Sequence, residues 1–260
     1  MMFEVPPATL GHPVLDRPIW AALASRQSHL ALTSGGARMF DPAFSHFGCE
    51  GPIGHEDVEG FTRLAHRVND GLTVMQADPI NDRAGLACSV RTMGLQMVWT
   101  GSKLPDNSAR LSLVLDSKDT TEMQELVAFT EPGPFRPATH RLGTYLGIRR
   151  GGRLVAMAGE RLKPSGYSEI SAVCVHPEFR GQSLARMLVS ELVRSILARN
   201  EVPFLHLYAT NTPALNLYKS MGFEQRRRVH IISFTKAEAR MPGPLPKAEP
   251  ESHPKATDHL

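Results

Sequence analysis

The fold is decided by the stretch Arg180-Gly181-Gln182-Ser183-Leu184-Ala185. It follows a short apolar run that ends at Val175, and it precedes a segment in which apolar residues recur every three or four positions as far as about residue 199. The first pattern is typical of a buried strand and the second of an amphipathic helix. A basic turn between them leaves free backbone N–H groups at a helix N-terminus, where a pyrophosphate can bind.

The residues around the turn support this interpretation. His176-Pro177 predicts the end of the strand, because proline has no N–H and holds its predecessor extended. Gly181 has no Cβ, so phosphate oxygens can approach the backbone closely, and Arg180 can offer a guanidinium fork. Taken alone, the turn is as compatible with an ordinary strand-to-helix connection that carries a solvated arginine.

A second group of elements follows in the chain. The run Phe204-Leu205-His206-Leu207-Tyr208 is typical of a strand, and Asn211-Thr212-Pro213-Ala214 predicts a capped helix start with proline in the first turn. Met221-Gly222-Phe223 predicts the end of that helix at a glycine, and residues 229–234 predict a last strand.

With the turn motif followed by the motif that begins at Asn211, the chain resembles the GNAT superfamily of acyl-CoA-dependent N-acyltransferases. The resemblance is carried by residues 173–185 and 211–218, followed by 221–223, and it covers about 111–234. It implies an α/β fold with a mixed sheet, acetyl-CoA as the acyl donor and no metal. It also implies direct acetyl transfer to an amine in a ternary complex, and no residue in the sequence stands out as an activated nucleophile with a partner base.

The same resemblance implies roles for particular residues. Tyr218 occupies the position of the tyrosine that protonates the leaving thiolate, and Glu169 that of a carboxylate base acting through water. Asn211 would bind the cofactor arm, and the amides near Cys174 and Val175 would face the pantetheine and thioester. The expected pyrophosphate-binding residues are Arg180, Gly181, Gln182, Ser183, Leu184 and Ala185.

Alternatives remain open for the catalytic residues. Glu169 is either a base in the cleft or a surface carboxylate at a strand start, and Glu160 is a second candidate base. His176 fits a loop residue better than a base, because it precedes a proline at a strand end. His206 fits a core imidazole and a cleft residue equally, and Tyr218 also fits an aromatic on a buried helix face.

Ser183 departs from the family pattern, which places a glycine there. A Cβ at a position that requires positive φ costs about 1 kcal/mol. A serine in the first helical turn is tolerated, and its hydroxyl can donate to a phosphate. We expect Ser183 to lie in the first helical turn.

Composition excludes several classes of protein. The formal net charge of +3 does not indicate a nucleic-acid partner, and 42% hydrophobic residues suffice for a sizeable core. No segment is long enough to span a membrane, and no membrane partner is expected. Three widely spaced cysteines (Cys49, Cys88 and Cys174) indicate neither a disulfide framework nor a metal site, and they fit a reducing cytoplasm.

We expect three regions in the chain. Residues 1–109 form a divergent N-terminal α/β unit, 110–235 the GNAT-like domain, and 236–260 a disordered proline-rich tail. The N-terminal unit is either a degenerate copy of the same fold or a supporting unit that walls the substrate site. Within it we expect helices over 17–23 and 56–68 and strands over 28–33, 71–77 and 94–99.

Within the GNAT-like domain we expect a first strand over 111–115, a helix over 120–129 and a hairpin of strands 144–149 and 153–160. The acceptor is expected to be a small-molecule amine, since no charged groove is evident. An acyl-CoA sensor or inactive relative is the alternative function. A homodimer remains open.

Overall fold

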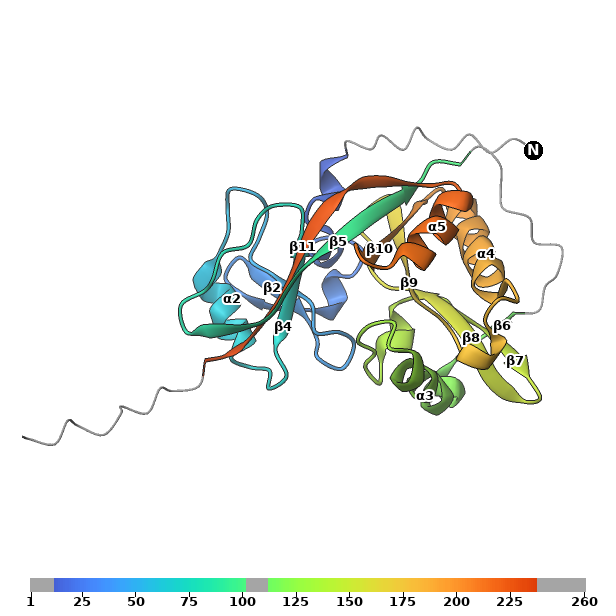
Figure 1. Ribbon diagram of the computed structural model, residues 1–260. Helices are drawn as coiled ribbons and strands as arrows, with labels where there is room; N and C mark the ends of the chain where they lie inside the picture. The colour runs from blue at the N-terminus through green and yellow to red at the C-terminus, as the bar shows by residue number, and fades with distance from the viewer. Residues whose placement is uncertain (1–11, 102–111, 238–260) are drawn as a thin grey trace, which may run out of the picture.

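The computed structural model describes residues 12–101 and 112–237. Its main feature is a sheet in the order β4-β11-β5-β10-β9-β8-β7-β6 (Figure 1). The strands of this sheet are β4 (Leu72–Gln76), β5 (Leu86–Trp99), β6 (Leu113–Val114), β7 (Tyr145–Arg150), β8 (Arg153–Glu160), β9 (Tyr167–Val175), β10 (Val202–Tyr208) and β11 (Phe223–Lys236).

The sheet is mixed. β9 and β10 pair in parallel, connected through the helix α4 (Leu184–Ala198), and the other neighbouring strands pair antiparallel. A parallel pair needs such a crossover, because its two strands run in the same direction. The prediction of an α/β fold with a mixed sheet is therefore confirmed.

Helices cover both faces of the part of the sheet formed by β7–β10. Side chains alternate along β7, so that Leu146 and Ile148 pack in one core with α4 while Tyr145 packs in another with α3 (Thr120–Thr130). The helix α5 (Thr212–Ser220) follows β10 and contributes Tyr218 to the α4 core. Figure 1 shows α3 on one side of these strands and α4 and α5 on the other.

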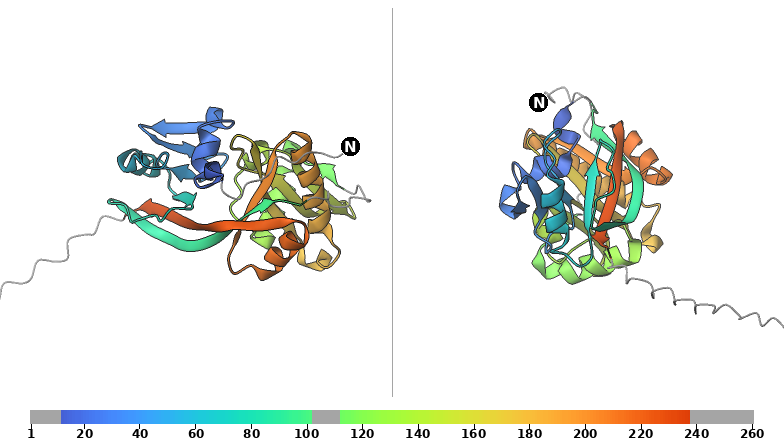
Figure 2. Two further views of the ribbon diagram at one scale, coloured as in Figure 1. Left: turned by 90° about the horizontal axis from the view of Figure 1, so that it is seen from above. Right: turned by 90° about the vertical axis from the view of Figure 1, so that its left-hand side faces the viewer.

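The N-terminal residues do not stand apart from this sheet. β4 and β5 flank β11, and β5 lies between β11 and β10. The remaining elements pack at one end of the long β5–β11 pair, as Figure 2 shows. They are α1 (Pro18–Leu23), α2 (Val58–Ala65) and a separate antiparallel sheet of β1 (Ala31–Ser34), β2 (Ala37–Phe40) and β3 (Gly48–Cys49). The predicted boundary at residues 109 and 110 lies outside the described residues, but strands from both sides of it share one sheet.

Short 3-10 helices complete the described chain. They are Pro13–Leu15, Ser28–Leu30, Ser117–Asp119, Thr139–Leu142 and Pro177–Phe179. The 3-10 helix Ser28–Leu30 replaces the first half of the strand expected over residues 28–33. The expected tail at 236–260 falls largely outside the described residues. No helix in the described ranges has the length and apolarity needed to cross a membrane.

One irregularity positions the site. The β9–β10 pairing stops at Ile170 and Leu205, although both strands continue. Just beyond Ile170, the register between β8 and β9 shifts, and Ala172 has a φ of 51°. A bulge of this kind bends its strand and ends local pairing. The far halves of β9 and β10 therefore separate and leave a space between two strands of one sheet.

Candidate active site

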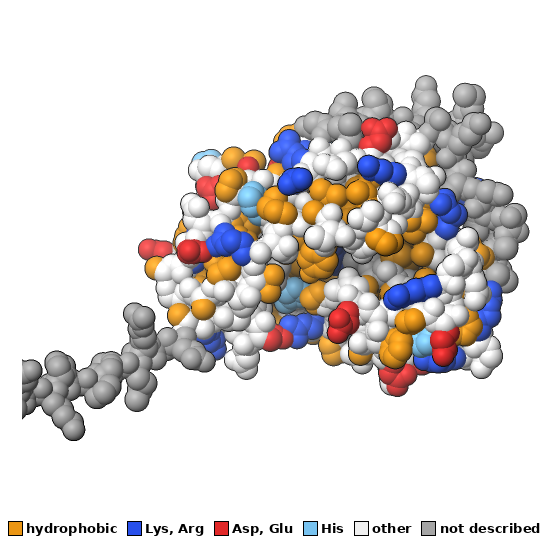
Figure 3. Space-filling view, viewed as in Figure 1, with side chains coloured by type: hydrophobic (Ala, Val, Ile, Leu, Met, Phe, Trp, Pro, Cys, Tyr) orange, Lys and Arg blue, Asp and Glu red, His pale blue; other side chains and the backbone are white. Residues whose placement is uncertain are grey.

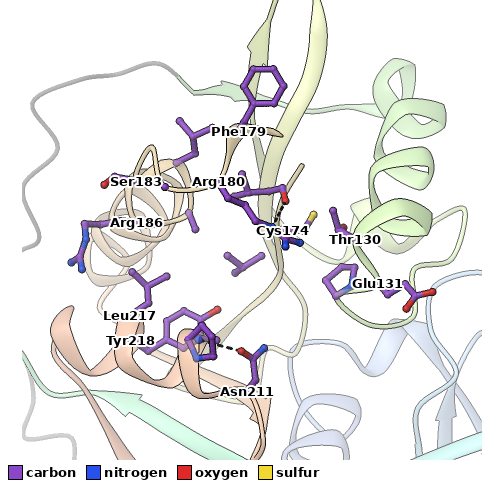
Figure 4. A pocket seen from close by; sticks show the side chains of 18 of the residues that line it. Thr130, Glu131, Cys174, Phe179, Arg180, Ser183, Arg186, Asn211, Leu217 and Tyr218 are labelled. Carbon is purple, nitrogen blue, oxygen red and sulfur yellow. Dashed lines mark hydrogen bonds between the residues drawn. The ribbon is translucent and has the colours of Figure 1, made fainter. Parts of the chain in front are cut away.

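A cavity of about 590 Å³ lies where β9 and β10 separate. Figure 4 shows the turn at Arg180 and Ser183 on one side, Thr130 and Glu131 on the other, and Tyr218 with Asn211 at one end. Of the cofactor-binding residues expected from the sequence, the structure brings to this cavity Cys174, Val175, Arg180, Gly181, Ser183, Leu184, Ala185 and Asn211. Gln182 does not line it.

The turn before α4 leaves donors unpaired. Met187 N–H donates to the carbonyl of Ser183, so the first helical hydrogen bond leaves the amides of residues 183–186 without an intrahelical acceptor. No side chain caps this end. These amides and the helix dipole favour an anion at the cavity wall.

Ser183 does not have the conformation expected from the sequence. Its φ is 58° and its ψ is 14°, so it lies in the left-handed region as the N-cap of α4, not in the first helical turn. Gly181 has a φ of 77°. Gly181 and Ser183 are both left-handed, and together they turn the chain sharply into the helix. At Ser183 this conformation has a steric cost that a glycine would avoid.

The free edge of β9 offers further donors. His176 N–H donates to Val155 O of β8 at 2.8 Å. Because amides alternate in direction along a strand, the N–H of Val175 points to the opposite side, where β10 has separated. The N–H of Cys174 points back to β8. The Cys174 thiol is an inert wall group, since burial raises its pKa to about 11.

Tyr218 and Asn211 stand between this cavity and a second one. Burial raises the pKa of the Tyr218 hydroxyl above its usual range, so the phenol is neutral and can donate a proton. The Oδ1 atom of Asn211 accepts from Ala214 N–H at 3.1 Å and caps α5. Its amide NH₂ group can still donate to a bound molecule.

The second cavity, here called the acceptor cavity, has a volume of about 300 Å³. Figure 3 shows a hollow on this face in which apolar side chains predominate. The acceptor cavity shares Pro132, Val173, Tyr208, Asn211, Ala214 and Tyr218 with the first cavity. The N-terminal residues supply another wall with His46, Phe47, Thr73, Met75 and Val90. A role of this unit as a substrate wall stays a prediction.

Comparison with known proteins agrees with this geometry. A family described as FR47-like protein matches residues 145–231. A solved structure described as a GNAT-family acetyltransferase from Novosphingobium aromaticivorans is 36% identical, with a TM-score of 0.80, and the match covers 87% of this chain and 100% of that one. The chain belongs to the GNAT family of acetyltransferases.

Other GNAT relatives match less of the chain. The N-alpha-acetyltransferase RimI of Mycobacterium tuberculosis is 38% identical over 96 residues, which are 34% of this chain and 59% of RimI. NAA20 of Arabidopsis thaliana, the catalytic subunit of the N-terminal acetyltransferase B complex, is 36% identical over 25% of this chain and 38% of its own length. The chain thus spans less than two thirds of the length of either relative. A GCN5-related N-acetyltransferase from Kribbella flavida shares the fold at 17% identity and a TM-score of 0.53, over 83% of this chain and 95% of its own.

The environment of Glu169 in this GNAT protein differs from that expected of a base. Its carboxylate is fully buried and accepts from Arg161 Nη2 at 2.6 Å and from His206 Nδ1 at 2.7 Å. Burial raises its pKa, but the Arg161 charge and the hydrogen bonds outweigh burial and lower it to about 2. An anion held in this way has little affinity for a proton, so Glu169 serves to hold Arg161 and His206 in place.

The other candidate bases are also engaged elsewhere. Glu160 is buried and forms ion pairs with Lys163 and Arg199. His176 stacks on Phe129 at 4.7 Å and does not line either cavity.

His206 does line the acceptor cavity, but both of its ring nitrogens are occupied. Nδ1 donates to Glu169, and Nε2 lies 3.0 Å from Nε2 of Gln96. Gln96 donates through the same Nε2 atom to Leu15 O, which fixes its orientation. His206 therefore accepts at Nε2 and carries its proton on Nδ1, so it is a structural residue of the cavity wall.

Among the residues of the acceptor cavity that sequence analysis missed, two have basic side chains. Arg161 lies beside Glu169, and His46 comes from the loop before β3. Burial first, and then the charges of Arg161 and Arg136, lower the pKa of His46 to about 4. No motif marks either residue. Among the described residues, no cluster of three or more His, Cys, Asp or Glu could hold a metal ion.

Proposed function

We propose that this protein transfers the acetyl group of acetyl-CoA to the primary amine of a small molecule. The observation that carries the proposal is the separation of β9 from β10 after Ile170 and Leu205. The separation opens the larger cavity, which has the free amides of the α4 N-terminus at its wall. This cavity adjoins the smaller acceptor cavity, and Tyr218 lines both. A thioester placed between the strands would meet an acceptor at Tyr218.

The larger cavity fits the donor. Arg180 and the amides of residues 183–186 supply positive charge and hydrogen-bond donors for the pyrophosphate. The free amide of Val175 is placed to hydrogen-bond the pantetheine or to polarise the thioester carbonyl. The volume of about 590 Å³ lies in the range of ordinary ligand sites.

The reaction needs a neutral amine and a protonated leaving group. The amine nitrogen attacks the thioester carbon, the C–N bond forms, the C–S bond breaks with its electron pair on sulfur, and the Tyr218 hydroxyl donates its proton to that sulfur. The amine nitrogen releases one proton to solvent, and solvent returns one to Tyr218. Direct transfer in this way needs no covalent enzyme intermediate.

The acceptor cavity favours the neutral form of the amine. None of the described residues that line it is Asp or Glu, and Arg161 places a guanidinium charge at its wall. The same charge helps to lower the pKa of His46. It disfavours an ammonium ion for the same reason, so the cavity favours binding of the neutral amine, after the ammonium ion has released a proton to solvent.

A peptide N-terminus is the second candidate acceptor. RimI and NAA20 are named for acetylation of α-amines or N-termini, and they are 38% and 36% identical to parts of this chain. The limited acceptor cavity of about 300 Å³ favours a small molecule instead.

A thiol-release assay with acetyl-CoA tests the proposed function. The panel of acceptors contains free amino acids, simple alkylamines and short peptides with free N-termini. Release of CoA that depends on a small amine supports the proposal, and release that depends only on peptides favours the second candidate. Binding of acetyl-CoA without release for any acceptor would favour the acyl-CoA sensor.

A further inference from the structure

We infer that the acceptor carries a carboxylate, and that Arg161 and Tyr145 bind it. The acceptor would then be an amino acid with an apolar side chain. The inference rests on the proposed function, since it names the substrate class of the same site. It depends on four features of the acceptor cavity.

The first feature is the fixed orientation of Arg161. Its Nε donates to Glu169 Oε2 at 2.9 Å and its Nη2 to Oε1 at 2.6 Å. The guanidinium carbon lies 4.7 Å from the centre of the Phe47 ring. Among the hydrogen bonds of the described residues, none involves Nη1. Glu169 thus holds one edge of the guanidinium and Phe47 covers one face, while Nη1 keeps a free donor at the cavity wall. This donor can bind a second carboxylate.

The second feature is the unpaired hydroxyl of Tyr145. The residue is 1% exposed, and no described group forms a hydrogen bond with its Oη atom. Its ring lies against Gly159, where any Cβ would collide with it, and packs edge-on against Phe135 at 5.7 Å. The ring therefore cannot turn to find a partner. Buried hydroxyls without partners are rare, because desolvation is then uncompensated.

The third feature brings these two groups together. Tyr145 and Arg161 both line a small cavity of about 10 Å³, together with Ser171 and Ala172. Arg161, Ser171 and Ala172 also line the acceptor cavity, so the small cavity adjoins it. Its volume suits one carboxylate oxygen, or one water that bridges to the carboxylate. A carboxylate at this place would accept from Arg161 Nη1 and satisfy the Tyr145 hydroxyl.

The fourth feature is the character of the remaining wall. Apolar side chains from four strands line it, namely Met75, Val90, Leu207 and Ile231. No Asp or Glu among the described residues lines it, so nothing there would neutralise a second ammonium group. Polyamines and other dicationic acceptors are therefore disfavoured. An aliphatic or aromatic side chain fits this wall.

Matched acceptors test the inference. The thiol-release assay compares L-leucine with L-leucinamide and 3-methylbutylamine, and L-phenylalanine with L-phenylalaninamide and phenethylamine. We expect kcat/KM for the free acids to exceed that of their carboxylate-free analogues by about 100-fold. The simple amines leave the buried donors unpaired, and the amides can accept from them but offer no negative charge to Arg161. Values within a few fold would overturn the inference, although transfer to any of these amines would still support the proposed function.

The variant Tyr145→Phe removes only the hydroxyl, so it keeps the packing against Gly159. We expect it to reduce the preference for the free acids about tenfold, mainly through KM. Its thermal stability and its affinity for acetyl-CoA should match those of the wild type. Tyr167→Phe, on a ring that does not line the acceptor cavity, is the matched control and should keep the full preference. An unchanged preference in Tyr145→Phe would also overturn the inference.

A binding measurement decides the case without turnover. With CoA at saturation, calorimetry compares N-acetyl-L-leucine with N-acetyl-L-leucinamide. We expect the acid to bind more tightly, and more weakly to Tyr145→Phe than to the wild type. Equal or absent binding of the two products would count against the carboxylate site. Failure of acetyl-CoA itself to bind would count against the proposed function as well.

Discussion

Arg161 holds Glu169 by both oxygens, with Nη2 2.6 Å from Oε1 and Nε 2.9 Å from Oε2. Oε1 also accepts from Nδ1 of His206 at 2.7 Å. The carboxylate in the expected position of a catalytic base is therefore part of a buried ion pair. Its hydrogen bonds join two residues of the acceptor-cavity wall, Arg161 and His206. A structural role of Glu169 at this wall has measurable consequences.

The first prediction concerns stability and pH. Because the pKa of Glu169 is lowered from 4.5 to about 2, its stabilising contribution is complete above pH 4.5 and is lost as the pH falls towards 2. We expect Glu169→Gln to lower the free energy of unfolding by about 3–5 kcal/mol at pH 7, since it leaves Arg161 buried without its partner. Urea denaturation should show this deficit shrinking below pH 4.5.

Glu59→Gln is the matched control, because the Glu59 side chain is 92% exposed. It should change stability little at any pH. If Glu169→Gln kept the wild-type stability and lost only kcat, Glu169 would be a base and not a structural anion.

The second prediction concerns Tyr218. Tyr218→Phe keeps the ring in the α4 core and removes the proton donor, so kcat should fall about 100-fold while the affinity for acetyl-CoA is unchanged. Steady-state kinetics and calorimetry on the same preparations check both halves of this expectation. Wild-type turnover in the variant would remove Tyr218 from the mechanism.

The third prediction concerns the pyrophosphate end of the larger cavity. Arg180→Ala should weaken acetyl-CoA binding by about 1.5–3 kcal/mol, or roughly 10- to 150-fold, if the guanidinium contacts a phosphate. Arg228→Ala, at an exposed position of β11, removes the same charge away from the cavity and should have little effect. Equal losses in the two variants would indicate only a general effect of charge.

The fourth prediction concerns the left-handed N-cap of α4. Ser183→Gly should raise the free energy of unfolding by about 1 kcal/mol, because glycine adopts a φ of 58° without the steric cost of a Cβ. Gln182→Gly is the control, since Gln182 is not among the residues with positive φ and glycine there only adds chain entropy. A loss of stability in both variants would contradict the strained conformation of Ser183.

Local sequence patterns predicted much of the fold. The strand, turn and helix around Gly181 follow from neighbouring residues, and so do the helix after Asn211 and the hairpin across Gly151-Gly152. The sequence pattern also predicts a strand at 94–99, although β5 begins earlier, at Leu86. Its partners β10 and β11 lie more than 100 residues further along, so no local signal places it between them.

The site was predictable only where motifs mark it. Tyr218, Asn211 and the turn residues belong to motifs, and the structure places them at one cavity, apart from Gln182. The walls of the acceptor cavity come from distant segments, and His46 reaches it only through tertiary packing. The conformation of Ser183 and the occupied carboxylate of Glu169 depend on geometry that residue types do not reveal.

Titration of the wild-type protein with acetyl-CoA by isothermal calorimetry tests the central claim most directly. We predict saturable binding of about one molecule per chain, which is weakened in Arg180→Ala and accompanied by thermal protection of the protein. A titration with no heat of binding and no shift in melting temperature would contradict the assignment of the cavity beside α4 to acetyl-CoA.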